Sequence, residues 1–428
     1  MRRTLTFLLF EKMERRDALK LIGVSFLATV MGCGRKYLSL EDGPDSAYSI
    51  IRDAEDERVR QLFKQYGANP SSSINIAFMT DSHIDLGSNV AENYQNVRDA
   101  IRFCSNADVP VSAIMQGGDI VTKIFGRKEQ HIEHMSEYFD MSWKTQVPHL
   151  YTKGNHDLNA INVSPSHLLS DEDWGKVWFD KAESYYGIVR NKKATGQKSG
   201  YYYYDLKAWK VRIISIDCFD VDYSQTDSEG NILYWGGTSN FIANEQFNWI
   251  VHTALNFDDK EEKDWGVILF THFYHPSDKD GTSIEPVFDS IYKKFNDMLL
   301  AFNKQRAFSL TYSLPQNNFY NLSVNVDWSR YAEEDKKPYL ICVLSGHQHT
   351  DIYQNWWGVK HIVTANQFCG TQYSDERIKR TPSSRSQNLF DIINIDLKER
   401  KMRVFRYGAS ANIDGQEGNR FLNDGLSF

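Results

Sequence analysis

The sequence predicts an α/β protein in which five polar motifs meet at one edge of the sheets. Short apolar, β-branched runs that end at Gly or Asp are typical of buried strands, and a polar motif follows each run directly. In α/β sheets, functional residues gather at the carboxyl ends of strands, because the loops there converge. The predicted strands are Ile74–Met79, Val111–Met115, His149–Tyr151, Val267–Phe270 and Leu340–Leu344.

The five motifs carry side chains that divalent metals prefer. Carboxylate, imidazole and one amide oxygen suit hard or borderline ions, and no Cys is among them, which argues against a structural zinc knuckle. One such motif alone would usually be a turn or a surface loop. Five at the same structural position predict a catalytic centre with ligands for two adjacent ions. The motifs are Asp81-Ser82-His83, Gly117-Gly118-Asp119, Gly154-Asn155-His156-Asp157, Thr271-His272 and Gly346-His347-Gln348-His349.

Helices are predicted before the first strand and within two long excursions of the chain. Asp42–Gln65 has the pattern of a lead-in helix, and Ser170–Trp174 has that of a helix start. Between the fourth and fifth motifs, apolar residues recur at helical spacing and predict one amphipathic helix. These residues are Ile284, Phe288, Ile291, Phe295, Met298, Leu299 and Phe302.

The end of the chain is predicted to form a hairpin. Asn388–Leu397 and Lys401–Tyr407 alternate between apolar and polar residues, as paired strands do. We expect this hairpin to close the second sheet and the tail after Gly408 to be loose.

From Ile74 to Asp351, the order of the motifs resembles that of the calcineurin-like metallophosphoesterase superfamily. Two intervening features are also similar to that family: the pair Tyr202–Asp205 and Val211–Asp217, and the segment Asn244–Trp249. The resemblance implies a four-layer α/β/β/α sandwich with two mixed β-sheets. The expected domain organisation is a signal segment 1–33, a linker and lead-in helix 34–73, a metallophosphoesterase domain 74–410 with insertions 158–200 and 276–338, and a tail 411–428.

The resemblance also implies a role for each motif residue. One ion would be held by Asp81, His83 and His349, and Asp119 would bridge both ions with its two anionic oxygens. His156 would be the catalytic histidine, close to the phosphate and not a ligand. The ligands of the other ion would be Asn155, His272 and His347.

Two of these assignments, His272 and Asp157, need a separate argument. His275 lies three residues after His272, and we prefer His272 because it follows the strand directly, as the family pattern requires. Asp157 is assigned to the catalytic group as a residue that could orient a neighbouring imidazole.

Departures from the family pattern exclude two branches of the family. Protein Ser/Thr phosphatases carry Asp, and purple acid phosphatases an iron-binding Tyr, at the position of Thr122. The Ser/Thr phosphatases also continue with Glu where this chain has Asp157. Neither branch fits, which leaves a broad group of bacterial phosphodiesterases and phosphomonoesterases.

The expected reaction is hydrolysis of a phosphoester. A hydroxide that bridges two metal ions would be the nucleophile, and His156 would assist the leaving group. Manganese, iron and zinc all suit the ligands, and a nucleotide, a lipid headgroup or a sugar phosphate could be the substrate. The alternative is a catalytically retired binding lipoprotein of the cell envelope on the same fold, but such proteins commonly lose Asp119, Asn155 or His156, and all three are present.

Residues outside the motifs have simpler interpretations. His131 and His134 lie three apart and are expected on a solvated helix face. Tyr201–Tyr204 is expected to be a strand with tyrosines on both faces. Trp356 and Trp357 are candidates for a pocket wall or for the core. The aromatic segment Gln316–Arg330 could line the substrate entrance.

Composition sets limits on partners and redox chemistry. The chain has 428 residues and a formal net charge of −7, which disfavours nonspecific binding to nucleic acid. The spacing of the cysteines does not indicate a disulfide framework, although two of them could still form one disulfide. The cysteines after position 33 are Cys104, Cys218, Cys342 and Cys369.

The first 33 residues have the features of an export signal. Arg15–Lys20 resembles a twin-arginine motif, and Leu21–Met31 is an apolar run too short to span a bilayer. Val30–Cys33 resembles a lipobox, so we expect a lipid anchor at Cys33 and a position in the bacterial envelope facing the periplasm. Either Met1 or Met13 could be the start.

Overall fold

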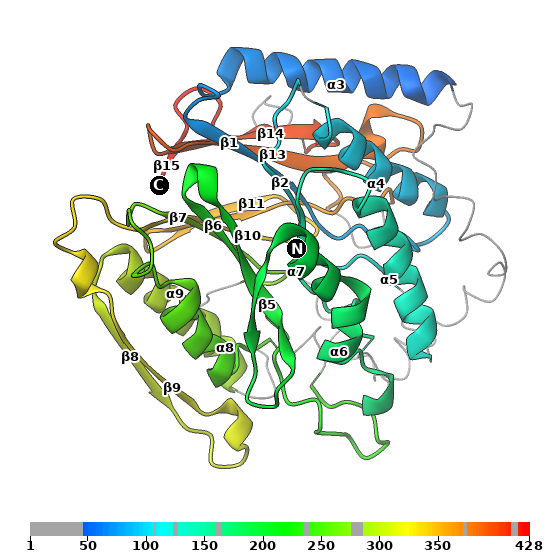
Figure 1. Ribbon diagram of the computed structural model, residues 1–428. Coiled ribbons are helices and arrows are strands. Elements are labelled where there is room, and N and C mark those ends of the chain that lie inside the picture. The colour runs from blue at the N-terminus through cyan, green and yellow to red at the C-terminus, as the bar shows by residue number, and fades with distance from the viewer. Residues whose placement is uncertain are drawn as a thin grey trace, which may run out of the picture. The chain divides into compact units, whose positions relative to one another are not determined.

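The apolar runs of the sequence form two mixed β-sheets with helices on their outer faces (Figure 1). This computed structural model describes residues 46–106, 108–122, 127–159, 164–234, 240–274, 286–370, 375–411 and 418–428. The predicted signal segment and Cys33 lie outside the described residues. Within them, no helix combines the length and the apolar character that crossing a membrane requires.

The first sheet has a parallel centre and an antiparallel flank. Strands β1, β2 and β3 are parallel neighbours, and the hairpin β13–β14 pairs with β1 antiparallel. The hairpin therefore forms as predicted, but it extends the sheet of β1 and not the sheet of the fifth motif. In spatial order the strands are β15 (Leu426–Ser427), β14 (Lys401–Gly408), β13 (Leu389–Asp396), β1 (Ser73–Met79), β2 (Ala113–Gln116) and β3 (His149–Tyr151).

The second sheet also has a parallel centre. β6, β7, β10 and β12 run in the same direction, and β5 and β11 flank them in the opposite direction. The edge strand β4 pairs antiparallel with β5. In spatial order the strands are β11 (Ile352–Trp356), β12 (Val359–Val363), β10 (Tyr339–Ser345), β7 (Gly266–Phe270), β6 (Val211–Ser215), β5 (Lys198–Leu206) and β4 (Val189–Lys192).

Three helices accompany the first sheet: α3 (Ser46–Tyr66), α4 (Val90–Cys104) and α5 (Lys128–Ser142). Figure 1 shows α3 lying along the sheet, which confirms the predicted lead-in helix within the described residues. One buried cluster joins α3 and α4 to β1, β2, β13 and β14, and its members include Val59, Phe103, Met79, Ile114, Phe390 and Phe405.

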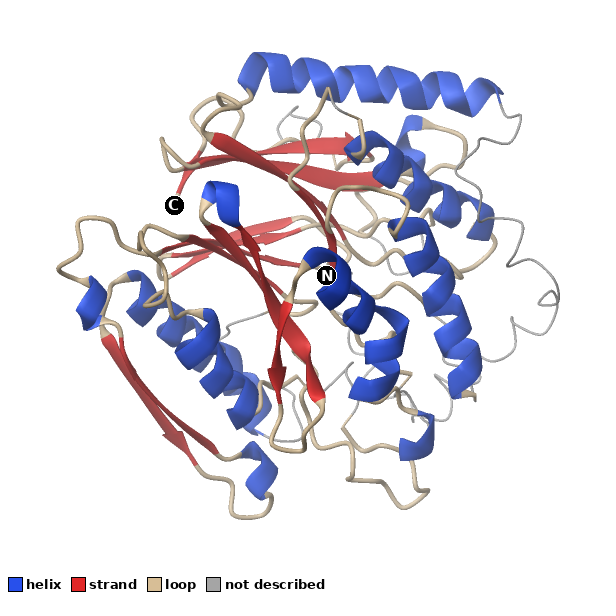
Figure 2. Ribbon diagram, viewed as in Figure 1, coloured by secondary structure: helices blue, strands red, loops and turns tan. Residues whose placement is uncertain are grey.

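The second sheet is covered by α8 (Asn244–Trp249) and α9 (Pro286–Asn303). The predicted amphipathic stripe is confirmed for Ile291, Phe295, Met298, Leu299 and Phe302, which are buried in one cluster with β6, β7 and β10. Ile284 and the side chain of Phe288 lie outside what the structure describes. Outside these helices lies a two-stranded sheet, β8 (Ala307–Tyr312) and β9 (Leu322–Asp327) (Figure 2). The inward residues of β9 join the same cluster, so much of the 316–330 segment serves as a cover for α8 and α9.

The excursion after the third motif packs against the edges of both sheets. Its helices are α6 (Asp171–Trp174) and α7 (Asp180–Tyr186). The predicted helix start is confirmed, and Ser170 forms a capping box with Asp173. The ring of Trp174 stacks on Tyr151 of β3. The Tyr202 hydroxyl of β5 bonds both the N–H and the carbonyl of Tyr151 at 2.8 Å, which joins the two sheets.

Two predictions about peripheral residues are wrong. His131 is fully buried, and its Nε2 lies 2.7 Å from the Asp157 carbonyl oxygen, so it does not belong to a solvated face. The described tail is not loose: β15 pairs with β14, and Arg420 forms a salt bridge with Asp391. The tail stays attached because its backbone continues the ladder of the first sheet.

Candidate metal centre

Each motif begins where a strand ends. Five residues of the motifs have a strained backbone conformation. The three parallel strands of the first sheet and β7 and β10 of the second deliver the motifs to a common place. A left-handed φ is rare for residues other than glycine and marks functional sites. Here it ranges from 38° to 66° at Asp81, His83, Asp119, His347 and His349.

The first group of side chains consists of Asp81, His83 and His349, whose possible ligand atoms lie within 4.8 Å of one another. His349 Nε2 is 3.0 Å from Asp81 Oδ1. The other oxygen of Asp81 accepts hydrogen bonds from the Thr80 hydroxyl at 2.6 Å and the His347 N–H at 2.9 Å. One oxygen of Asp81 is therefore fixed by the protein, and the other faces the group.

The second group consists of Asp119, His272 and His347, and Asn155 lies beside it. His272 Nδ1 is 2.7 Å from the Gly117 carbonyl oxygen, so this nitrogen carries a proton and Nε2 points into the group. Nε2 is 3.1 Å from Asn155 Oδ1, 3.1 Å from His347 Nδ1 and 3.2 Å from Asp119 Oδ2. Three further donor atoms thus surround one imidazole nitrogen.

Asp119 lies between the two groups. Its Oδ2 is 3.2 Å from His272 Nε2 and 3.8 Å from His83 Nε2. Its Oδ1 accepts a hydrogen bond from the His156 N–H at 2.9 Å. Contacts with imidazoles of both groups are thus made by Oδ2, while Oδ1 bonds the loop that carries His156.

His156 is next to the groups but belongs to neither. Its Nδ1 is 2.9 Å from the Thr122 carbonyl oxygen, which can only accept, so Nδ1 carries the proton. Its ring stands edge-on to that of His83, with 5.1 Å between the centroids. This leaves Nε2 as the nitrogen that can exchange a proton.

Asp157 has a different role from the one expected. Its buried carboxylate accepts hydrogen bonds from the N–H groups of Asp119, Ile120 and Gly154 at 2.8 Å and from the Tyr151 hydroxyl at 2.7 Å. The carboxylate of Asp157 therefore does not orient an imidazole, as expected from the sequence. Backbone N–H donors surround it, because the loops after β2 and β3 meet there. Asp157 positions the loop that carries Asp119.

Electrostatics leave the side chains in the forms that bind cations. Burial acts to raise the pKa of Asp81, but the imidazoles of His349 and His272 hold it below its ordinary value. Burial lowers the pKa of both His83 and His347 to about 3, which keeps these imidazoles neutral with a free lone pair.

His272 differs from the other two imidazoles. Burial acts to lower its pKa, but the carboxylates of Asp119 and Asp81 raise it to about 9. These carboxylates therefore stabilise a positive charge at the position toward which His272 Nε2 points.

The donor atoms fit divalent metal ions. Ligands that share one cation at roughly 2.0–2.2 Å lie a little over 3 Å from one another, which is the spacing found around His272 Nε2. Nitrogen, carboxylate and amide donors without thiolate suit manganese, iron and zinc. The two groups are where two such ions would bind.

Three glycines let the loops approach so closely. A Cβ on Gly154 would overlap Asp119, and one on Gly118, whose φ is 93°, would lie 2.8 Å from His272 Nδ1. A Cβ on Gly346 would lie 2.5 Å from Asp81 Oδ2. Each of these three glycines is therefore needed for the close packing of a candidate ligand side chain.

Other candidate residues fall outside the centre or outside the described chain. His275 is not among the described residues. Tyr201 packs with Trp249 on one face of β5 and Tyr202 with Trp178 on the other, which confirms tyrosines on both faces. Trp356 stacks on His361 and packs against the core, whereas Trp357 is half exposed. The described cysteines, Cys104, Cys218, Cys342 and Cys369, are free and buried.

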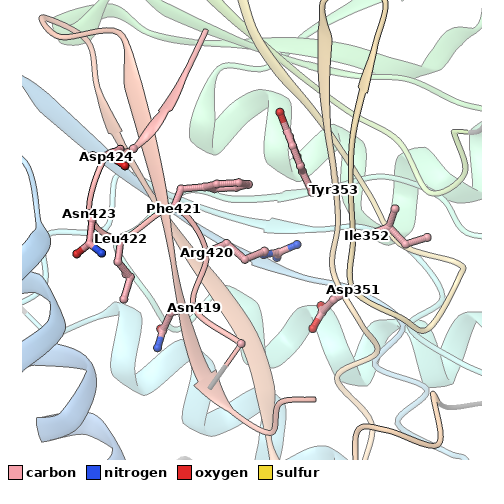
Figure 3. A pocket seen from close by; sticks show the side chains of 11 residues that line it. Asp351, Ile352, Tyr353, Asn419, Arg420, Phe421, Leu422, Asn423 and Asp424 are labelled. Atoms are coloured by element: carbon pink, nitrogen blue, oxygen red, sulfur yellow. The ribbon is translucent and has the colours of Figure 1, made fainter. Parts of the chain in front are cut away.

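A cavity of about 570 Å³ lies apart from the metal ligands, between β11 and residues 418–425 (Figure 3). Its lining includes Asp351, Tyr353, Arg420 and Phe421 and none of the nine residues assigned from the motifs. It therefore plays no part in the centre described above.

Several solved structures are similar to this chain. The chain is similar to a dimetal phosphatase from Danio rerio, with 14% identity, a TM-score of 0.46 and coverage of 78% of this chain and 96% of that one. It is also similar to phosphopantetheinyl hydrolase from Mycobacterium tuberculosis, with 10% identity, a TM-score of 0.33 and coverage of 69% and 91%. No curated protein matches the chain significantly.

A family model decides the classification. Residues 74–351, nearly two thirds of the chain, match calcineurin-like phosphoesterase. The two mixed sheets with outer helices confirm the fold expected of that family. The chain belongs to the calcineurin-like phosphoesterase family and is a hydrolase of phosphoric ester bonds.

Proposed function

We propose that the chain hydrolyses a small phosphorylated molecule with two divalent cations and His156 as the proton donor. Asp81, His83 and His349 hold one cation, and Asp119 is shared between the two. The other cation is held by Asn155, His272 and His347. Manganese, iron and zinc are the candidate metals.

One observation carries this proposal: the surroundings of His272 Nε2. Its partner nitrogen is committed to the Gly117 carbonyl, and three donor atoms from Asp119, Asn155 and His347 lie 3.1–3.2 Å away. Four side chains that can offer lone pairs meet in a buried place, where such an arrangement is costly unless a cation or a proton lies between them. The neighbouring group of Asp81, His83 and His349 offers ligands for a second cation.

The residues of this chain divide the chemical work. When bound, two divalent cations supply Lewis acidity, which activates water and offsets the charge that develops on the phosphate. Asp81 and Asp119 contribute the anionic oxygens, each fixed through its other oxygen by backbone N–H donors. Because these contacts exist before substrate binds, little reorganisation is required.

His156 handles the proton of the leaving group. The Thr122 carbonyl holds Nδ1–H, so a proton on Nε2 is the one that can pass to the leaving oxygen. In this step the Nε2–H bond breaks, an O–H bond forms on the leaving group, and the imidazole returns to its neutral form.

The substrate is a nucleotide, a lipid headgroup or a sugar phosphate, and either a diester or a monoester. The half-buried ring of Phe273 stands edge-on to His347, with 5.1 Å between the centroids, and offers an apolar surface to the organic part of such a molecule.

The experiment compares hydrolysis with metal content on one preparation. Chelator-treated protein is supplied with Mn²⁺, Fe²⁺ or Zn²⁺ and assayed with bis(4-nitrophenyl) phosphate and 4-nitrophenyl phosphate, while bound metal is measured by mass spectrometry. We expect activity to rise with the binding of two ions per chain. His252→Ala, which removes an exposed histidine, is the control. Activity that survives complete metal removal would contradict the proposal.

We further propose that the protein acts in the bacterial cell envelope, anchored by a lipid at Cys33 and facing the periplasm. The support is the sequence of the first 33 residues alone. In the native host, the wild-type chain should sediment with membranes, and Cys33→Ser should be found in the soluble fraction. Wild-type protein in the cytosol without lipid would refute this placement.

A further inference from the structure

Thr122 contacts both halves of the site. It follows Asp119 by three residues and is half-buried. Its hydroxyl oxygen is 2.8 Å from His83 Nδ1, and its carbonyl oxygen is 2.9 Å from His156 Nδ1. Its own N–H donates to Asp85 Oδ1 at 2.6 Å. One residue thus touches an imidazole of the first metal group and the imidazole that handles the proton.

The hydroxyl decides which nitrogen of His83 faces the group. His83 Nε2 is the atom on the side of Asp119, at 3.8 Å from Oδ2. For Nε2 to offer a lone pair to a cation, the proton must be on Nδ1. The Thr122 hydroxyl can accept that proton in a hydrogen bond, and its contact with Nδ1 fixes the ring orientation that puts Nε2 on the side of the group.

The carbonyl makes the complementary choice at His156. It has no proton to donate, so it holds Nδ1–H and turns Nε2 away from the backbone. Asp85, which is buried, keeps this peptide in place through the Thr122 N–H. The side chain of Thr122 therefore acts on the first metal group, and its backbone acts on His156.

We propose that Thr122 is a positioning residue: its hydroxyl holds His83 with Nε2 toward the first cation, while its carbonyl holds His156 with Nε2 toward the substrate. This rests on the two-cation centre proposed above. Side-chain substitutions separate the two contacts, because the carbonyl is present in every variant.

Thr122→Val and Thr122→Ser form a matched pair. Valine keeps the shape of threonine without the hydroxyl, and serine keeps the hydroxyl without the methyl group. Metal-free protein is titrated with Mn²⁺ by calorimetry, and the bound metal is counted by mass spectrometry. In Thr122→Val we expect one of the two ions to bind roughly 10–100-fold more weakly and the other as in the wild type. In Thr122→Ser both ions should bind as in the wild type.

Each result decides the matter. Two unchanged binding steps in Thr122→Val would overturn the proposal, and so would equal losses in both variants, since packing of the methyl group would then be responsible. Thermal melting of the metal-free variants checks that they are folded, and the exposed substitution His252→Ala should change neither step. If the wild-type chain itself bound no pair of ions, the two-cation centre would fail first, and this inference with it.

Discussion

The two metal groups differ in how the protein holds their histidines. In the second group, the outer nitrogen of His272 bonds a backbone carbonyl, that of Gly117. In the first group, the outer nitrogen of His83 bonds a side-chain hydroxyl, that of Thr122. Asp81 of the first group also depends on a side chain, the Thr80 hydroxyl, whereas Asp119 is held by a backbone N–H.

The backbone contact of His272 persists in any variant, whereas the side-chain contacts of His83 and Asp81 can be changed by substitution. A backbone carbonyl is present whatever the residue, so single substitutions leave the support of His272 in place. A substitution of Thr122 would remove the hydroxyl that contacts His83. One of Thr80 would remove part of the support of Asp81, which keeps the His347 N–H. We therefore expect the first group to be the one whose metal affinity varies with its surroundings.

Asp119→Asn tests the comparison at the residue that both groups share. An amide oxygen carries no full charge, and Oδ2 lies near histidines of both groups, so both cations would lose their common anion. We expect turnover to be nearly abolished and metal to be stripped, by more than the roughly 10–100-fold that outer-shell substitutions cost. Turnover and metal content of the purified variant are the measurements, and a variant with both ions bound as in the wild type would show that Asp119 does not bridge.

His156→Ala should separate rate from metal binding. Its imidazole contacts Thr122 and belongs to neither group, so both ions should stay bound. Loss of the proton donor should lower kcat by roughly 10²–10⁴-fold. The loss should be smaller for phosphoesters whose leaving group needs no proton, which is measured with a series of substituted phenols.

The matched control for this variant is the exposed His252→Ala, for which rate and metal content should be those of the wild type. Absence of metal from His156→Ala would mean that the division between ligand and acid is wrong.

Gly346→Ala should disturb the first group more than the second. Its Cβ would overlap the Thr80 hydroxyl and lie 2.5 Å from Asp81 Oδ2, so Asp81 must move. We expect one ion to bind about 10–100-fold more weakly. Gly196→Ala is the control, because its Cβ meets nothing within 4 Å and it costs only backbone strain of about 1–2 kcal/mol. Equal weakening of both ions in a Mn²⁺ titration would argue against two separable groups.

The sequence indicated which side chains would lie close together, because each candidate ligand directly follows an apolar strand. Asp81, Asp119 and His272 could be placed together without knowing any distance, since parallel strands bring their carboxyl ends to one edge. The division into the two groups came from the family resemblance, and the structure brings the same side chains together.

The contacts behind the ligands could not be read from the sequence. Asp157 lies in a metal motif, but its burial among backbone N–H donors depends on how the loops after β2 and β3 meet. Thr122 stood out only as a departure from relatives. The burial of His131 did leave a signal: with Met135, Tyr138 and Phe139 it forms an i, i+4, i+7, i+8 stripe, which predicts a core face.

Asp351→Asn should have the smallest effect on catalysis and tests how far the first group depends on its remote anchor. Asp351 follows His349 by two residues, and both its oxygens bond Arg406, at 2.7 and 2.9 Å. Arg406 also pairs with Asp391 and so keeps a partner in the variant. We expect a stability loss of about 1–3 kcal/mol at neutral pH and little change in the binding of either ion.

The same variant should alter the acid limb of stability. Burial acts to raise the pKa of Asp351, but Arg406 and Arg420 hold it below its ordinary value. A lowered pKa in the folded state gives stability that is present above the unfolded value and is lost as pH falls through the folded one. Asparagine takes up no proton, so the urea midpoint of the variant should fall less than that of the wild type between about pH 5 and pH 3. Asp424→Asn, exposed on the same cavity (Figure 3), should follow the wild type, and parallel curves for all three proteins would show that Asp351 carries no acid-labile stability.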